Sequence, residues 1–132
     1  MNVTQLKKAL LEGAFDKRFA YIYGEEAVAA QKARYAAAID SFVALYGSDR
    51  EAALYSVAGR SEISGNHTDH NFGRVIAASI DLDIIAVASP NAENIIRVKS
   101  EGFDEDVIDL GETKREVARI WQLLNSLCRE AR

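Results

Sequence analysis

The chain has 132 residues, enough for one domain with a hydrophobic core. It is 48% hydrophobic and 27% charged, as soluble proteins are, and its formal net charge of −4 argues against a nucleic-acid partner. Its one cysteine, Cys128, excludes an internal disulfide, and no apolar run approaches the length of a membrane span, so a cytoplasmic protein with no membrane partner is expected.

Two helices are predicted in the first half of the chain. Residues 4–12 form a short helix, with Thr4 as its N-cap and Gly13 after its end. Residues 25–46 form a long, alanine-rich helix that begins with two acids and ends at Gly47. Its apolar side chains recur mainly at three- and four-residue spacings and predict one buried face: Val28, Tyr35, Ile39, Phe42, Val43 and Tyr46.

Strands are predicted in the middle of the chain. Runs rich in Val, Ile and Ala predict strands at 54–58, 74–80 and 82–89, and Pro90 marks the turn that follows. A half-exposed strand at 94–99 and an edge strand at 103–110 come next.

Residues 112–132 are predicted to close the chain as a helix. It carries an apolar stripe: Val117, Ile120, Trp121, Leu124, Leu127 and Cys128. The whole order predicts a single α+β domain over residues 1–132, with a mixed or antiparallel sheet of about five strands and helices packed on it.

The densest polar segment is residues 59–73, which read GRSEISGNHTDHNFG between two predicted strands. A polar, glycine-punctuated turn between rigid elements is a common way to present functional groups. The carboxylate of Asp69 accepts two neighbouring hydroxyl protons, and a neutral His67 both donates and accepts. Arg60 supplies a permanent positive charge. The segment is therefore the candidate ligand site.

This segment resembles the N-terminal signature of galactokinases, which reads roughly G-R-x-N-L-I-G-E-H-T-D-Y-N-x-G. The resemblance extends over about residues 35–110 and places the chain beside the GHMP small-molecule kinases. It implies the N-terminal part of a GHMP-kinase-like (ribosomal protein S5 domain 2-like) fold and galactose, or a related monosaccharide, as the ligand. It also implies that Arg60 is catalytic and lies beside the reacting sugar hydroxyl, while Asn66, His67 and Asp69 hold the other hydroxyls.

The chain departs from the family's usual residues at several positions in and just before this segment. Asn66 replaces the usual glutamate, Glu62 an asparagine, His70 a tyrosine and Ala58 a proline. These changes leave the sugar class as expected and the exact sugar open.

A phosphate-binding loop is not found in the sequence. The closest pair of glycines, Gly59 and Gly65, is six residues apart, and no P-loop pattern occurs. The chain is therefore expected to be the sugar-recognition portion of a galactokinase-like sugar 1-kinase, inactive alone, with ATP and Mg²⁺ binding only with an absent C-terminal portion. The alternatives are a non-catalytic sugar-binding or sensing module and a degenerate remnant that binds nothing.

Other readings of the same residues stay open. Arg60 could bridge a surface carboxylate, and Asp69 could cap a turn. His67, Asp69 and His70 could converge on a metal ion, although no further histidine exists to complete the set, and no metal is expected. The apolar stripe of the last predicted helix could instead pair two copies of the chain as a homodimer.

Overall fold

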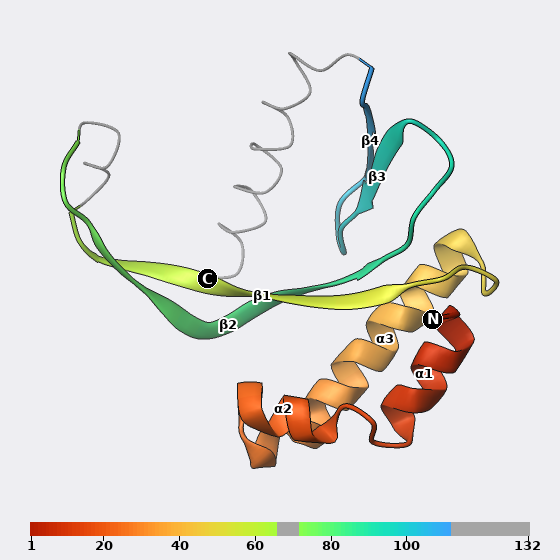
Figure 1. Ribbon diagram of the computed structural model, residues 1–132, viewed down its shortest axis with the longest axis horizontal. Helices are drawn as coiled ribbons and strands as arrows, with labels where there is room; N and C mark the ends of the chain where they lie inside the picture. The colour runs from red at the N-terminus through yellow and green to blue at the C-terminus, as the bar shows by residue number, and fades with distance from the viewer. Residues whose placement is uncertain (66–71, 112–132) are drawn as a thin grey trace. The chain divides into compact units, whose positions relative to one another are not determined.

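The computed structural model describes residues 1–65 and 72–111 of the chain. Contacts divide the chain into two compact units, Met1–Pro90 and Asn91–Arg132. The first unit contains α1 (Val3–Leu11), α2 (Asp16–Tyr23), a 3₁₀ turn η1 (Glu25–Ala27), α3 (Val28–Tyr46), β1 (Ala53–Ser64) and β2 (Ile76–Ala88). The described part of the second contains β3 (Ile95–Lys99) and β4 (Glu105–Asp109) (Figure 1). The α+β class predicted from the sequence is confirmed.

Helix α1 lies where a helix was predicted, but its N-cap is different. The side chain of Asn2 accepts a hydrogen bond from the backbone N–H of Thr4 at 2.9 Å, so the prediction of Thr4 as the cap is wrong. Val3 is fully buried and already helical, which moves the cap back to Asn2. Gly13 follows the end of the helix with φ of 89°, a conformation in which glycine has no Cβ penalty.

Helix α3 confirms the strongest prediction. The first residues of the predicted span form η1, and the helix ends before Gly47, where φ is 87°. Tyr35, Ile39 and Phe42 are buried, and the other members of the predicted face (Val28, Val43 and Tyr46) pack against the same core.

Helix α2 is not among the predicted elements. It is eight residues long, DKRFAYIY, and is rich in aromatic residues, which have only moderate helix propensity. Asp16 lies in its first turn and favours the positive end of the helix dipole, and Gly24 with φ of 88° follows its end. Burial of Phe19 in the core holds this helix in place.

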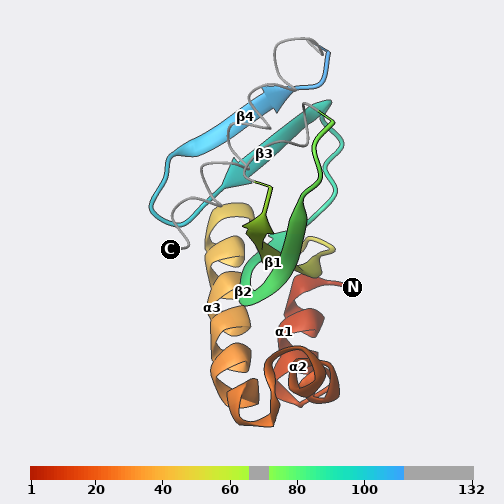
Figure 2. The ribbon, with the colours of Figure 1, turned by 90° about the vertical axis from the view of Figure 1, so that its left-hand side faces the viewer.

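The core of the first unit lies among the helices. Its buried residues are Val3, Leu6, Leu10, Phe19, Tyr35, Ile39, Phe42 and Ala52. Three half-buried strand residues, Leu54, Ile85 and Val87, pack against it. The helices therefore cover one face of the β1–β2 ribbon near the start of β1 and the end of β2 (Figures 1 and 2).

β1 and β2 form a long antiparallel ribbon, and two of the predicted strand bounds are wrong. The predicted strand at 54–58 extends to Ser64, because the polar residues that follow it pair through their backbone in an exposed ribbon. The predicted strands at 74–80 and 82–89 are one strand. The ladder shifts register between them, so pairing with β1 continues on both sides of the shift.

β3 and β4 form a second antiparallel hairpin, with Ile95 opposite Asp109 and Lys99 opposite Glu105. Both strands lie within the predicted ranges (Figure 2). The expected sheet of about five strands is not confirmed, since the described residues form two separate two-stranded sheets. The predicted helix over residues 112–132, with its stripe, lies outside the described residues. None of the helices in the described ranges has the length and apolar character needed to cross a bilayer.

Candidate functional site

The polar signature begins inside β1. Residues 59–64 belong to the strand, so the prediction that the turn starts at Gly59 is wrong. Arg60 pairs with Ser79 of β2, and its side chain is exposed. It makes no side-chain hydrogen bond or ion pair with any residue in 1–65 or 72–111. Its guanidinium carries five N–H donors, and none of these residues engages them.

The other three predicted sugar contacts, Asn66, His67 and Asp69, lie outside the described residues, as does His70. Their convergence with Arg60, and the alternative of a metal site among them, thus stay predictions. Elsewhere, the described parts of the chain hold no group of three or more His, Cys, Asp or Glu side chains that could hold a metal ion.

Two glycines of the signature occupy positions that a larger residue would disturb. A Cβ on Gly59 would lie 3.0 Å from the side chain of Ile80 and 3.1 Å from the carbonyl oxygen of Leu82. Gly65 has φ of 114°, and a Cβ there would lie 2.6 Å from Val75 and 2.7 Å from the carbonyl oxygen of Arg74. Both glycines therefore permit close backbone approach in the ribbon that carries Arg60.

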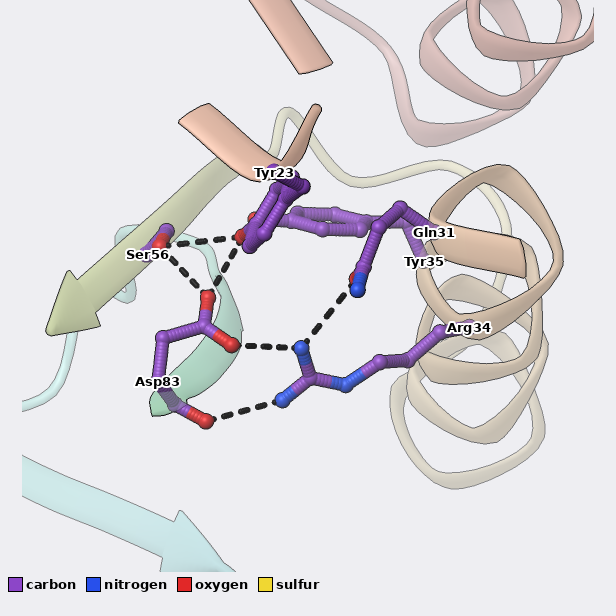
Figure 3. A network of polar contacts seen from close by, with 6 residues as sticks. All are labelled: Tyr23, Gln31, Arg34, Tyr35, Ser56 and Asp83. Atoms are coloured by element: carbon purple, nitrogen blue, oxygen red, sulfur yellow. Dashed lines mark hydrogen bonds and ion pairs between the residues drawn. The ribbon is translucent and has the colours of Figure 1, made fainter. Parts of the chain in front are cut away.

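A polar network joins the ribbon to the helices, and Asp83 of β2 is its centre (Figure 3). One carboxylate oxygen accepts hydrogen bonds from the hydroxyls of Tyr23 at 2.5 Å and Ser56 at 2.6 Å. The other accepts from Arg34 at 2.5 Å, and the same guanidinium donates to the Asp83 backbone carbonyl at 2.9 Å. Elements α2, α3, β1 and β2 thus meet at one residue.

The hydroxyl protons of the network have one consistent arrangement. When Tyr23 and Ser56 each donate their single proton to the carboxylate of Asp83, the Tyr35 hydroxyl, 2.9 Å away, donates to Tyr23, and the 3.1 Å contact between Tyr23 and Ser56 has no proton. Burial and the hydrogen bond to Asp83 raise the pKa of Tyr23 well above its usual value, so this phenol stays protonated and remains a donor.

Asp83 is well buried for a carboxylate, with 9% of its side chain exposed. Burial alone would raise the pKa of this carboxyl, but the hydrogen bonds from Ser56, Tyr23 and Arg34, together with the Arg34 charge, outweigh it. They hold the pKa of Asp83 below its usual value of 3.8. The group is therefore an anion at neutral pH, fully engaged by its donors.

Stability in acid should depend on Asp83. Because its pKa is lower in the folded chain, the carboxylate stabilises the fold fully above the ordinary value of 3.8, and this contribution is lost as pH falls through the lower folded-state pKa. Urea unfolding of the parent and of Asp83→Asn should differ in free energy by a constant amount above about pH 5, and the gap should narrow in stronger acid. If the difference in unfolding free energy between the parent and Asp83→Asn stayed constant into strong acid, a lowered pKa of Asp83 in the folded chain would be contradicted.

An open pocket of about 320 Å³ lies beside the network. Its lining residues are Tyr23, Ala27, Gln31, Arg34, Asp81, Leu82 and Asp83. Sequence reasoning missed this cluster. The available signal was Asp83 itself, a charged residue inside the apolar run of β2, at a position that alternation places on the same face as Ile85 and Val87.

The polar segment lies in a region that is similar to a known protein family. A sequence profile described as the galactokinase galactose-binding signature matches residues 40–90. Residues 40–90 are therefore similar to the galactose-binding signature of galactokinases. The match spans the end of α3, all of β1 and β2 and the segment between them, so it includes Arg60 and the other predicted sugar contacts.

Curated galactokinases are similar to part of this chain. The galactokinase of Chloroflexus aggregans is 39% identical over 64 residues, which are 48% of this chain and 16% of that protein. The galactokinase of Enterococcus faecalis is 36% identical over 67 residues, which are 51% of this chain and 17% of that protein. That of Candida parapsilosis is 29% identical over 86 residues, or 63% of this chain and 17% of that protein. The matched part of the chain thus spans about a sixth of the length of these galactokinases. No solved structure matches the chain.

Proposed function

We propose that this chain is the galactose-recognition portion of a galactokinase-like sugar 1-kinase, in which the γ-phosphoryl group of ATP passes to the anomeric hydroxyl of galactose. The match of residues 40–90 to the galactose-binding signature carries the proposal. It includes a single sugar-recognition domain over residues 1–132, with the N-terminal part of a GHMP-kinase-like fold, in the cytoplasm. A homodimer formed by two copies of the chain belongs to the same proposal.

The residue roles are those that the resemblance to the galactokinase signature implies, and the chemistry of each side chain agrees with them. Arg60 lies beside the reacting hydroxyl, where a fixed positive charge stabilises the oxygen as it becomes a nucleophile facing phosphate. Its exposed guanidinium in β1, which no residue in the described ranges engages, supports this role. Asp69 accepts protons from two neighbouring hydroxyls, His67 donates to one oxygen and accepts from another, and Asn66 adds an uncharged contact.

Phosphoryl transfer requires groups that these 132 residues do not supply. Such catalysis depends on positioning the triphosphate and neutralising its charge. The sequence has no glycine- and serine-rich phosphate loop. We therefore expect ATP and Mg²⁺ to bind only when further kinase residues accompany this portion, and the 132 residues alone to be inactive.

Calorimetric titration of the 132-residue chain with galactose, using glucose as the epimeric control, tests the proposal. We expect saturable heat with galactose and little with glucose, because Asp69 and its neighbours read the arrangement of the sugar hydroxyls. No heat with either sugar would contradict sugar recognition by this chain. Binding without turnover, even after the ATP-binding portion of a galactokinase is added, would favour a sensing module over a kinase.

A further inference from the structure

The Asp83 network stands at a particular place on the ribbon. Asp83 pairs with Ala58, and this is the last pair before the ladder changes register. The next pair joins Arg60 to Ser79, so β1 advances by two residues (58 to 60) while β2 advances by four (83 to 79). Gly59 lies at this bulge, close to the backbone of Leu82. The network thus lies on the side of the bulge that is nearer to the helices, and Arg60 lies on the far side of the bulge.

Beyond the bulge, the described ribbon has no core of its own. Every residue of 60–64 and 72–82 is exposed, whereas Ile85 and Val87, before the bulge, pack against the helices. Backbone pairing alone specifies register weakly when neither face of a strand is buried. A slip by one residue would turn the side chain of Arg60 to the opposite face. Contacts on the buried side of the bulge must therefore hold the register of β1 against β2.

We infer that Asp83, with Tyr23, Arg34 and Ser56, is a positioning group that sets the register of the β1–β2 ladder beyond the bulge and so places Arg60. Ser56 and Asp83 lie on the two paired strands, and their 2.6 Å hydrogen bond ties one strand to the other. Arg34 donates hydrogen bonds to both the side chain and the backbone carbonyl of Asp83. These bonds hold β2 against α3 and oppose sliding of β2 along its own axis. The placement of Arg60 for sugar rests on the proposed function, whereas the register does not.

A disulfide reporter measures the register directly. Ser61 and Ala78 are directly opposite each other beyond the bulge. Opposed residues of antiparallel strands have Cα atoms about 4.5–5.5 Å apart, within the range a disulfide spans. The test uses Ser61→Cys with Ala78→Cys in a chain whose native Cys128 is replaced by serine, and follows cross-linking under mild oxidation. In this background the cross-link should form readily.

Asp83→Asn should slow this cross-linking roughly tenfold, because charge-assisted hydrogen bonds that hold the register are lost. Tyr23→Phe, which removes one donor, should slow it less. The matched control is Asp40→Asn, which removes an ion pair with Lys7 that joins α3 to α1, away from the ribbon. All variants are compared at a temperature at which circular dichroism shows them folded. Unchanged cross-linking in Asp83→Asn would overturn the inference and leave the network a stabilising contact only.

Galactose titration of the same variants without the added cysteines tests the consequence for the site. Asp83→Asn should weaken binding roughly tenfold relative to Asp40→Asn. Slower cross-linking with undiminished galactose affinity would contradict the placement of Arg60 by the network. If the parent chain itself binds no galactose, the proposed function fails, and the cross-linking rates still decide the register.

Discussion

Asp69→Ala is expected to abolish galactose binding by the 132-residue chain and leave its fold intact. A carboxylate that accepts from two sugar hydroxyls contributes two charge-assisted hydrogen bonds, each worth about 1.5–3 kcal/mol, so affinity should fall at least about 100-fold. The described core is built from the three helices and Ala52, so the far-UV circular dichroism should not change. Calorimetric titration with galactose measures the loss.

Asp49→Ala is the matched control for that experiment. Asp49 is an exposed aspartate between α3 and β1, outside the polar segment 59–73 that holds the proposed sugar contacts, and its loss should leave galactose affinity as in the parent. Asp69→Asn, which keeps the shape and removes the charge, should fall between the two. Galactose binding by Asp69→Ala at parental affinity would show that Asp69 is not a sugar ligand.

Ile39→Ala should produce a large loss of stability. Ile39 is 0% exposed and belongs to the core cluster that joins α1, α2 and α3. Truncation of a buried isoleucine loses its transfer free energy and leaves a cavity, at a cost of about 2–4 kcal/mol. Since natural domains are stable by about 5–15 kcal/mol, urea unfolding should show a large drop in midpoint.

Leu45→Ala provides the comparison on the same helix. Leu45 is 53% exposed, and its truncation should change the unfolding free energy by no more than about 0.5 kcal/mol. Both variants should keep the parental m-value, which shows that the same surface is exposed on unfolding. Similar losses in the two variants would mean that the buried face of α3 has been assigned wrongly.

The helix α3 could be predicted because its information is local. Apolar residues recur at helical spacing from Val28 to Tyr46, and Gly47 ends the pattern. Helix α2 could not be found in this way, because its sequence has modest helix propensity and depends on Phe19 reaching a core formed by other helices. The N-cap of α1 was misplaced by two residues, since both Asn2 and Thr4 have capping side chains and only the burial of Val3 decides between them.

The ribbon was the hardest part of the fold to predict. Residues 60–64 are mostly polar, and polarity between strands usually indicates a turn. In this chain both faces of the ribbon are exposed beyond the bulge, so polar side chains are tolerated and backbone pairing continues to Ser64. The extent of a strand pair depends on its partner strand, which local patterns do not reveal.

One part of the candidate site could be found from the sequence, and another part could not. The signature was found from residue identities alone, because its chemistry is concentrated in fifteen consecutive positions, 59–73. The Asp83 network could not be predicted because its members are distant in the chain. Tyr23 and Asp83 are 60 residues apart and come into contact only after folding. The local sign of it was an aspartate on the core-facing side of an apolar strand.

The open ribbon also bears on how this chain behaves at high concentration. Beyond the helices, β1 and β2 pair only with each other among the described residues, so neither strand has a second partner strand there on its outer edge. Tyr55 and Val57 add exposed apolar side chains on the face away from the core. Such edges are templates for strand addition from another molecule, and charged side chains on an edge, such as Arg60 and Glu62, oppose that addition. Substitutions that neutralise these two positions would therefore reduce solubility as well as alter the site.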